Sequence, residues 1–300
     1  MNTENNLVPR ITGLLLLEVR KSNPNGDPER ESSPRQRPDG KGEISPVSVK
    51  RKLRDLVVDK EGVVWHELAQ QLSLAPDAFQ ILENRGRNRD EIKEKMKPTA
   101  GKLGQAFIDA YWDGRLFGNT FLEEGGSDTI RSGVAHFGVG VSLAPIDIEF
   151  STWTNKAGVE TGKDRGMAPL AFRVVKHGVY AVPFFVNPNL AHKTGCTKQD
   201  VDLMLNLIKY AYSNTRSVVR TMVDVLHVHT FTHLNRAGSV SDFALIDALT
   251  PKKLADPDKP SESIADYGSL PQWGAIKDQL IRPGASKTFA QCVSYTDYAL

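Results

Sequence analysis

The residues of this chain best placed to bind a ligand are four cations in a short run, and the ligand they suit is a chain of phosphates. Lys50, Arg51, Lys52 and Arg54 fall within five positions. On a helix such charges repel each other by roughly a few tenths of a kcal/mol per pair unless anions lie beside them. A nucleic-acid backbone supplies those anions. A solvated helix face with salt bridges elsewhere is the plainer alternative, because charge runs are common.

Positive charge is concentrated around this run. From residue 30 to residue 54 the chain has eight Lys or Arg and three Asp or Glu, a net charge of 8 minus 3, or +5, whereas the whole chain carries +2. A local excess on a nearly neutral background favours a nucleic-acid surface over general basicity. The eight cations are Arg30, Arg35, Arg37, Lys41, Lys50, Arg51, Lys52 and Arg54.

Two local elements must position these cations. Ser45 followed by Pro46 predicts a helix start, because the Ser hydroxyl can accept from a free amide and Pro fits the first helical position. Ahead of it, the apolar segment Ile11 to Val19 is typical of a central strand that needs cover on both faces. The turn formers NPNGDP at residues 23–28 end that strand. The apolar stripe of the helix comprises Val49, Leu53, Leu56 and Val57.

Composition indicates one folded domain with insertions. The 300 residues are 40% apolar and 25% charged, which is enough to build a core. The two cysteines, Cys196 and Cys292, have neither pairing nor metal-ligand spacing, as expected in a reducing cytosol. No signal peptide or apolar run of membrane length is visible. The sequence therefore predicts a cytoplasmic protein with no membrane partner.

After the basic helix, residues 63–126 show helical periodicity and charged stretches, which predicts an inserted helical lobe. A glycine-rich strand is then expected over Ile130 to Leu143, where glycines would let another backbone or a ligand approach closely. Arg131 and His136 on this strand could face an RNA, or the strand could simply be twisted by its glycines. Residues 148–170 have the turn chemistry of an exposed hairpin.

The last part of the chain alternates strands and a helix. A core strand is expected over Lys176 to Val186, a helix capped by Thr197, and a strand over Val219 to Phe231. His227 and His229 share one face of that strand, and His233 follows. Their spacing invites a metal site, but no carboxylate or fourth ligand can be placed beside them, so a histidine-bearing strand is the preferred interpretation. The Pro- and Asp-rich residues 251–300 are expected to form a peripheral arm packed on a neighbour.

Several of these motifs, taken in order, resemble one protein family. The turn NPNGDP after the first strand, followed by the helix VKRKLRDLV, is similar to the backbone subunit of CRISPR Cascade complexes, the Cas-seven family of the RAMP superfamily, of the type I-C and type I-B kind. The further matches are RLFG at Arg115 to Gly118, IRSGVAHFGVGVSLAP at Ile130 to Pro145, KHGVYAVPFFV at Lys176 to Val186 and HLNRAGS at His233 to Ser239.

The resemblance implies a specific α+β fold, a ferredoxin-like (RRM-like) palm with inserted helical fingers and a thumb hairpin. The predicted elements agree with this fold, since they follow one another as strand, helix, lobe, strand, hairpin, strand, helix and strand. The implied parts are a palm over 11–62, 127–147 and 171–250, fingers over 63–126, a thumb over 148–170 and a C-terminal arm over 251–300. In this fold the first helix would present Lys50, Arg51 and Arg54 outward along one line.

The resemblance also implies a function without catalysis, cofactor or metal. The protein would polymerise along a CRISPR guide RNA through phosphate contacts and leave the guide bases free to pair with target DNA. Its partners would be the guide RNA, the target DNA, copies of itself in a helical filament and the other Cascade subunits. The implied RNA-binding residues are Lys50, Arg51 and Arg54 on phosphates, Asn23, Asn25, Arg35 and Arg37 shaping the loop beside them, Arg131, His136, Asn235 and Arg236 as further contacts, and Met167 as a wedge between bases.

Two other classes of protein stay open. A RAMP-type ribonuclease that processes guide RNA or cuts target RNA would use Asp27, Asp39 or His136, but no base and acid stand at a convincing spacing. A stand-alone single-strand-binding protein is disfavoured because the 8% of aromatic residues form no interleaved stacking platform.

Overall fold

One antiparallel sheet of eight strands carries the fold. In sheet order the strands are β12 (Val293–Asp297), β11 (Val223–His233), β1 (Ile11–Ser22), β10 (Ala168–Val186), β8 (Gly140–Pro145) and β4 (Lys41–Ile44), with β7 (Ala135–Phe137) and β9 (Ile148–Asn155) pairing with other parts of β10. The computed structural model describes residues 7–84, 86, 88–97, 104–119, 131–155, 168–281 and 287–300. It is a mixed helix-and-sheet protein, as predicted.

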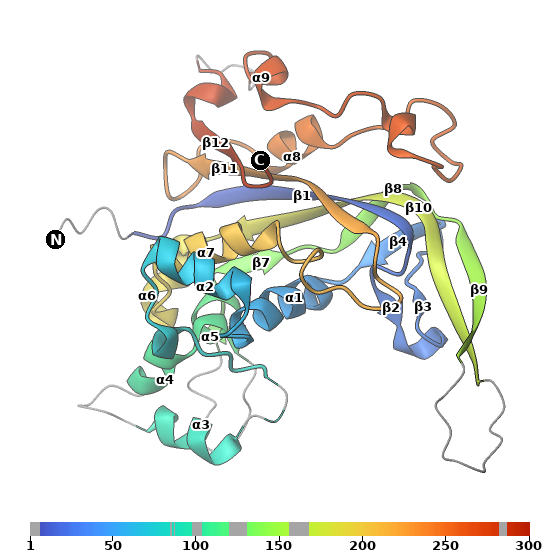
Figure 1. Cartoon of the computed structure of the whole chain (residues 1–300). Helices are drawn as coiled ribbons and strands as arrows, with labels where there is room; N and C mark the ends of the chain where they lie inside the picture. Colours follow the sequence, from blue (N-terminus) through green and yellow to red (C-terminus); the bar gives the residue numbers. More distant parts are fainter. Residues whose placement is uncertain are drawn as a thin grey trace, which may run out of the picture.

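The central strand β1 is buried on both faces, which confirms the sequence prediction. Successive side chains of a strand point to opposite faces. Leu15 and Leu17 pack into a core shared with the helices, whereas Leu14 and Leu16 pack into a second core with the C-terminal segment. All four leucines are fully buried. The sheet is therefore the middle layer of three (Figure 1).

The helices lie mainly on one face of this sheet (Figure 1). In chain order they are α1 (Pro46–Val58), α2 (Val63–Leu72), α3 (Arg89–Met96), α4 (Gln105–Ala110), α5 (Trp112–Phe117), α6 (Ala191–Thr194), α7 (Lys198–Ile208), α8 (Asp242–Leu249) and α9 (Trp273–Ile276). In the figure α8 and α9 lie on the opposite face. Within the described ranges, no helix combines the length and apolarity needed to cross a membrane.

Two helices, α1 and α7, begin where the sequence predicted. The Ser45 hydroxyl accepts from the amide of Ser48, and Pro46 is the first helical residue of α1. The predicted apolar stripe of α1 is buried. Thr197 and Asp200 form a capping box at the start of α7, which satisfies two amides that would otherwise lack partners.

Glycine allows the lobe to pack closely on the sheet. A methyl group on Gly133 would lie 2.1 Å from the carbonyl carbon of Phe117 and 2.4 Å from the amide nitrogen of Gly118. The adjacent Val134 donates its amide to the carbonyl of Leu116 at 2.8 Å. The expected close approach at the glycine-rich strand is thus confirmed, and the group that approaches is the backbone of the RLFG segment. The strand itself is broken into β6 (Arg131–Ser132, paired with β5, Gly118–Asn119), β7 and β8.

The predicted hairpin is present as the pair β9 and β10, which projects beyond the sheet (Figure 1). Pairing runs from Ile148 opposite Val175 to Asn155 opposite Ala168. The expected strand over Lys176 to Val186 is the second half of β10, so hairpin and core share one 19-residue strand. The hairpin tip, which includes Met167, lies outside the described residues.

The C-terminal segment corrects one prediction. It was expected to be a peripheral arm on a neighbouring molecule, but it packs on its own sheet. Trp273, Phe289 and Val293 join the second core with Leu14 and Leu16. β12 then pairs with β11. The reason is that the face of β1 that carries Leu14 and Leu16 is apolar and must be buried, and the aromatic residues of this segment bury it.

Candidate nucleic-acid interface

The basic helix meets the RLFG motif at one aromatic ring. The ammonium of Lys50 lies 5.0 Å and the guanidinium carbon of Arg54 5.3 Å from the centroid of Phe117. Both distances suit cation–π contacts. Burial, and then the charge of Arg54, lowers the pKa of Lys50. The ring of Phe117 therefore holds two cations of α1 near each other.

Arg54 is already largely occupied, which corrects the expected outward line of three cations. Its Nε donates to Asp113 Oδ2 at 2.8 Å, and the two side chains are only 12% and 1% exposed. Asp113 also accepts the amides of Leu82 at 2.7 Å and Glu83 at 3.2 Å. Arg54 therefore fastens α1 to the helical lobe, and phosphate binding by this residue stays a prediction.

Arg51 is more available. Its guanidinium pairs with Asp55 at 2.7 Å, and the side chains are 38% and 40% exposed. An exposed i,i+4 pair stabilises a helix by only about 0.3–0.5 kcal/mol. Exchanging Asp55 for a phosphate oxygen would cost little, so Arg51 and Lys50 are the two α1 cations best placed to bind RNA.

Lys52 points inward instead. Its Nζ donates to the Thr215 hydroxyl at 2.8 Å and lies 4.6 Å from the centroid of the Tyr212 ring. Burial lowers the pKa of Lys52 to about 8, with a further contribution from the charge of Arg220. Lys52 is thus a buried cation whose charge lowers the stability of the folded protein, and it presents little surface to a ligand.

We expect Lys52→Met to raise the free energy of unfolding by about 1–3 kcal/mol at pH 7. The lowered pKa of Lys52 means that its charge destabilises the folded form by about 1.4 kcal/mol for each pKa unit, and the loss of two side-chain contacts offsets part of the gain from removing that charge. The pKa of an unfolded Lys is about 10.4, so between pH 8 and pH 10 the unfolded wild type binds more protons than the folded form. Wild-type stability therefore rises through that window, and the advantage of the variant shrinks. Urea titrations of both proteins at pH 7 and pH 10 measure this.

The control for this prediction is Lys198→Met, at a lysine whose side chain is 44% exposed. Such a surface change is expected to stay within about 0.5 kcal/mol at both pH values. An unfolding free energy of Lys52→Met that is equal to or below that of the wild type at pH 7 would contradict the interpretation of Lys52 as a net burden.

His136 joins the Lys50 side of the interface. It lies on β7 with an exposed side chain. Desolvation of its ring, and then the charge of Lys50, lowers the pKa of His136. Arg131 precedes it on β6, where the structure describes the backbone but not the side chain. The structure thus brings Lys50, Arg54 and His136 together.

The polar loop beside α1 is braced by its asparagines. Asn25 Oδ1 accepts the amide of Ser45 at 2.7 Å, so it fixes the residue that caps α1. Asn23 is buried and donates its side-chain amide to the carbonyl of Ser32 at 2.7 Å. Arg35 also donates its backbone amide to the carbonyl of Asn25 at 3.0 Å. These contacts agree with the loop-shaping role expected of Asn23 and Asn25, and RNA contact by them stays a prediction.

The arginines of the loop keep only loose ion pairs. Arg35 lies 3.7 Å from Asp27, and Arg37 lies 3.5 Å from Asp39 and 3.7 Å from Glu43. Arg37 is 43% exposed. Distances this long in solvent contribute little stability, so both guanidinium groups can exchange partners.

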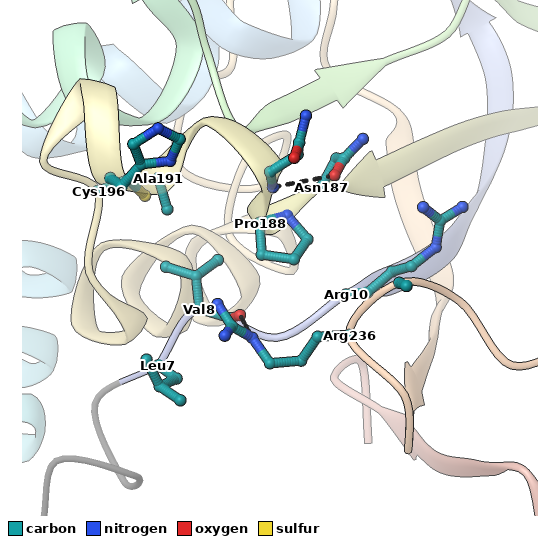
Figure 2. A pocket seen from close by; sticks show the side chains of 11 residues that line it. Leu7, Val8, Arg10, Asn187, Pro188, Ala191, Cys196 and Arg236 are labelled. Carbon is teal, nitrogen blue, oxygen red and sulfur yellow. Dashed lines mark hydrogen bonds between the residues drawn. The ribbon is translucent and has the colours of Figure 1, made fainter.

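Asn235 and Arg236 lie apart from the loop, and Arg236 lines a cavity (Figure 2). They follow β11, whose last residues pair with the start of β1, whereas Asn23 and Asn25 follow the end of β1. Arg236 Nε donates to the carbonyl of Val8 at 3.0 Å, and Asn235 Oδ1 accepts the amide of Ala237 at 2.9 Å. The cavity has a volume of about 840 Å³.

The acids proposed for a nuclease serve turns. Asp27 caps a short 3₁₀ helix (Pro28–Arg30) by accepting the amide of Glu29 at 3.2 Å. Asp39 accepts the amide of Lys41 at 3.1 Å. Among the described residues, the one group of three His, Cys, Asp or Glu side chains close enough to share an ion lies on β11 and β12, away from Asp27, Asp39 and His136.

Sequence reasoning missed a residue that joins the hairpin to the basic loop. Arg173 on β10 pairs with Glu31 at 2.6 Å and lies 3.3 Å from the Ser33 hydroxyl. Its guanidinium carbon also lies 5.5 Å from the ring centroid of Phe150, its cross-strand partner, which is 59% exposed. The sequence carries no local signal for this contact, because it depends on the register of β9 and β10.

A family model and a curated relative both match this chain and carry the same family description. The model of the family "CRISPR-associated protein Cas7" matches residues 9–271. A "CRISPR-associated protein Cas7" of Haloferax volcanii is 25% identical over 232 residues, which cover 67% of this chain and 63% of the relative, so the match spans less than two thirds of that relative's length.

Chains of solved structures were also matched. A "CRISPR RNA-guided surveillance complex, pre-nicking" contains a chain with TM-score 0.48 and 16% identity, with 82% of this chain and 83% of that chain covered. A "CRISPR RNA-guided surveillance complex" gives TM-score 0.45 and 18% identity, with 80% and 75% covered. Because the family model covers most of the chain, this protein belongs to the family of CRISPR-associated proteins Cas7.

Proposed function

We propose that this chain is the guide-RNA-binding backbone subunit of a type I Cascade surveillance complex. The observation that carries the proposal is the position of Lys50 on α1, beside the Phe117 ring of the RLFG motif, with the half-exposed Arg51 next to it in sequence, in a member of the Cas7 family. These cations suit phosphates, so the protein would grip the RNA backbone and leave base edges free. Copies of the chain would line up along one guide, whose bases pair with target DNA.

The sheet order supports the finer description of the fold. A ferredoxin-like palm places its four strands in the order four, one, three, two, all antiparallel. The neighbours β11, β1, β10 and β8 have this order and these directions, and α1 and α7 make the two crossings. We assign α2 to α5 to the fingers and the β9–β10 hairpin to the thumb, which would carry the base-separating Met167.

The proposed subunit has no catalytic role. Asp27 and Asp39 hold turns, and desolvation and then the charge of Lys50 lower the pKa of His136. An acid that is occupied in accepting a backbone amide within its own turn is poorly placed to transfer protons to a substrate. We expect Asp27→Asn, Asp39→Asn and His136→Ala each to leave the length distribution of bound RNA unchanged.

The test of the proposal is to purify the tagged chain from cells that carry its native neighbouring genes, and then to size and sequence the nucleic acid that copurifies. A discrete, intact CRISPR guide in a large particle with several copies of the chain is the expected result. Recovery of a free monomer without RNA would overturn the proposal. Cut RNA that becomes intact in the His136→Ala variant would favour a ribonuclease instead.

A further inference from the structure

Two histidines and a carboxylate converge at the edge of the sheet. His227 and His229 lie two residues apart on β11, so their side chains share a face, and Asp297 on β12 is the direct cross-strand partner of His229. One ligand atom from each residue lies within 4.8 Å of the others. The side chains of His227, His229 and Asp297 are 12%, 0% and 3% exposed.

The carboxylate is aimed at the two rings. Asp297 Oδ1 accepts the backbone amides of Val228 at 2.9 Å and Ala299 at 3.0 Å. Asp297 Oδ2 lies 2.6 Å from Nδ1 of His227 and 3.6 Å from Nδ1 of His229. Fixing one carboxylate oxygen with backbone donors orients the other, which is how outer-shell contacts position a metal ligand.

The two histidine rings lie against each other, and one of their nitrogen atoms has no hydrogen-bond partner. They are stacked, with centroids 4.6 Å apart and planes at 15°. His229 Nδ1 also lies 2.8 Å from the hydroxyl of Tyr295, while Nε2 of the same ring is buried and has no hydrogen-bond partner.

We propose that His227, His229 and Asp297 form a site for a divalent first-row transition metal such as Zn²⁺. Two imidazoles and one carboxylate are a donor set that suits Zn²⁺ and its neighbours rather than Mg²⁺ or Ca²⁺. Ligand atoms about 2.0–2.2 Å from a tetrahedral ion are roughly 3–3.5 Å apart, and the separations of 2.6 and 3.6 Å bracket that value.

The role of such an ion would be structural. It would join β11 to β12, and thereby fasten the C-terminal strand to the sheet. The ring of His227, whose side chain is 12% exposed, offers the entry path. On binding, the proton between His227 Nδ1 and Asp297 leaves to solvent, and the ion takes its place.

The experiment uses the full chain carrying a tag that contains no histidine. After treatment with a chelator, the protein is dialysed against Zn²⁺ alone and its metal content is measured, and a parallel sample with Co²⁺ is examined for visible absorption. We expect about one equivalent of Zn²⁺ per chain and a Co²⁺ spectrum of low coordination number. Zn²⁺ should also raise the melting temperature by several degrees.

Asp297→Asn tests the site without removing its frame, because the Asn carbonyl still accepts both backbone amides. We expect its Zn²⁺ affinity to fall by more than the 10–100-fold typical of losing an outer-shell contact. Asp242→Asn is the matched control, since Asp242 lies 3.4 Å from His233 in another His–Asp contact at the end of β11. This control should bind Zn²⁺ like the wild type.

If Asp297→Asn fails to fold, His227→Gln gives the same test at the more exposed ring. Equal Zn²⁺ content in the wild type and in either site variant would overturn the proposal, as would a wild type that binds no Zn²⁺. In those cases the cluster is only a hydrogen-bonded link between the two strands.

Discussion

Replacing Arg115 by alanine is expected to destabilise the protein by about 3–5 kcal/mol, the range for breaking a buried ion pair by removing one partner. Arg115 pairs with Asp200 at 2.7 Å, and the side chains are 7% and 0% exposed. The guanidinium also donates to the carbonyls of Ile108 at 2.7 Å, Asp109 at 3.0 Å and Ala78 at 2.8 Å. Alanine would leave a buried carboxylate and three carbonyls without these donors.

The effect should spread to α7. Asp200 is the residue that completes the capping box with Thr197, and its Oδ2 accepts the amide of Thr197 at 2.8 Å. Arg115, the first residue of the RLFG motif, is therefore a structural residue that joins the helical lobe to α7. Equilibrium unfolding in urea, followed by far-UV circular dichroism, measures the loss.

Arg51→Ala is the matched control for this stability prediction, since it removes the same side chain from an exposed pair. It should cost no more than about 0.5 kcal/mol. If Arg115→Ala and Arg51→Ala lowered the unfolding free energy equally, the Arg115 network would not hold the lobe to α7 as described.

The double variant Lys50→Ala with Arg51→Ala is expected to weaken binding of single-stranded RNA by about a hundredfold, because a hydrogen bond to a charged group contributes about 1.5–3 kcal/mol. The slope of log affinity against log salt should fall by about 1.4, or 0.7 for each neutralised phosphate. Arg54 is left intact, because removing it would leave Asp113 buried without its cation. Filter binding or fluorescence anisotropy over a range of salt concentrations measures both quantities.

The matched control removes two positive charges elsewhere. Lys252 and Lys259 are exposed residues of the C-terminal segment, which covers the face of the sheet opposite α1 (Figure 1). Their double alanine variant should bind RNA like the wild type. A guide and its shuffled sequence should lose affinity equally in the Lys50 and Arg51 variant, and a loss confined to one sequence would contradict a backbone contact.

Much of the fold could be predicted because its signals are local or periodic. Ser45 and Thr197 cap helices through groups that lie within a few residues of them, so the sequence alone locates α1 and α7. The apolar run of β1 requires cover on both faces wherever the rest of the chain lies. The helical lobe, the hairpin and the concentration of cations near α1 follow from the same kind of pattern.

Which side chains are free to bind was decided by tertiary structure. Arg51 and Arg54 are equivalent in sequence, yet one meets a half-exposed Asp55 on its own helix and the other a buried Asp113 that is 59 residues away. Lys52, in the same run, is buried against Tyr212 and Thr215, in the segment that follows α7.

Long-range pairing decided the rest. Asp297 lies beside His227 and His229 because β12 pairs with β11 in one register. The C-terminal segment covers its own sheet because Leu14 and Leu16 of β1 pack against it. A sequence determines caps and periodicity through neighbours along the chain. Contacts between segments that are distant in sequence decide which charges pair, which side chains cluster around a ligand and what covers an apolar face. These contacts form only when the strands of the sheet have paired.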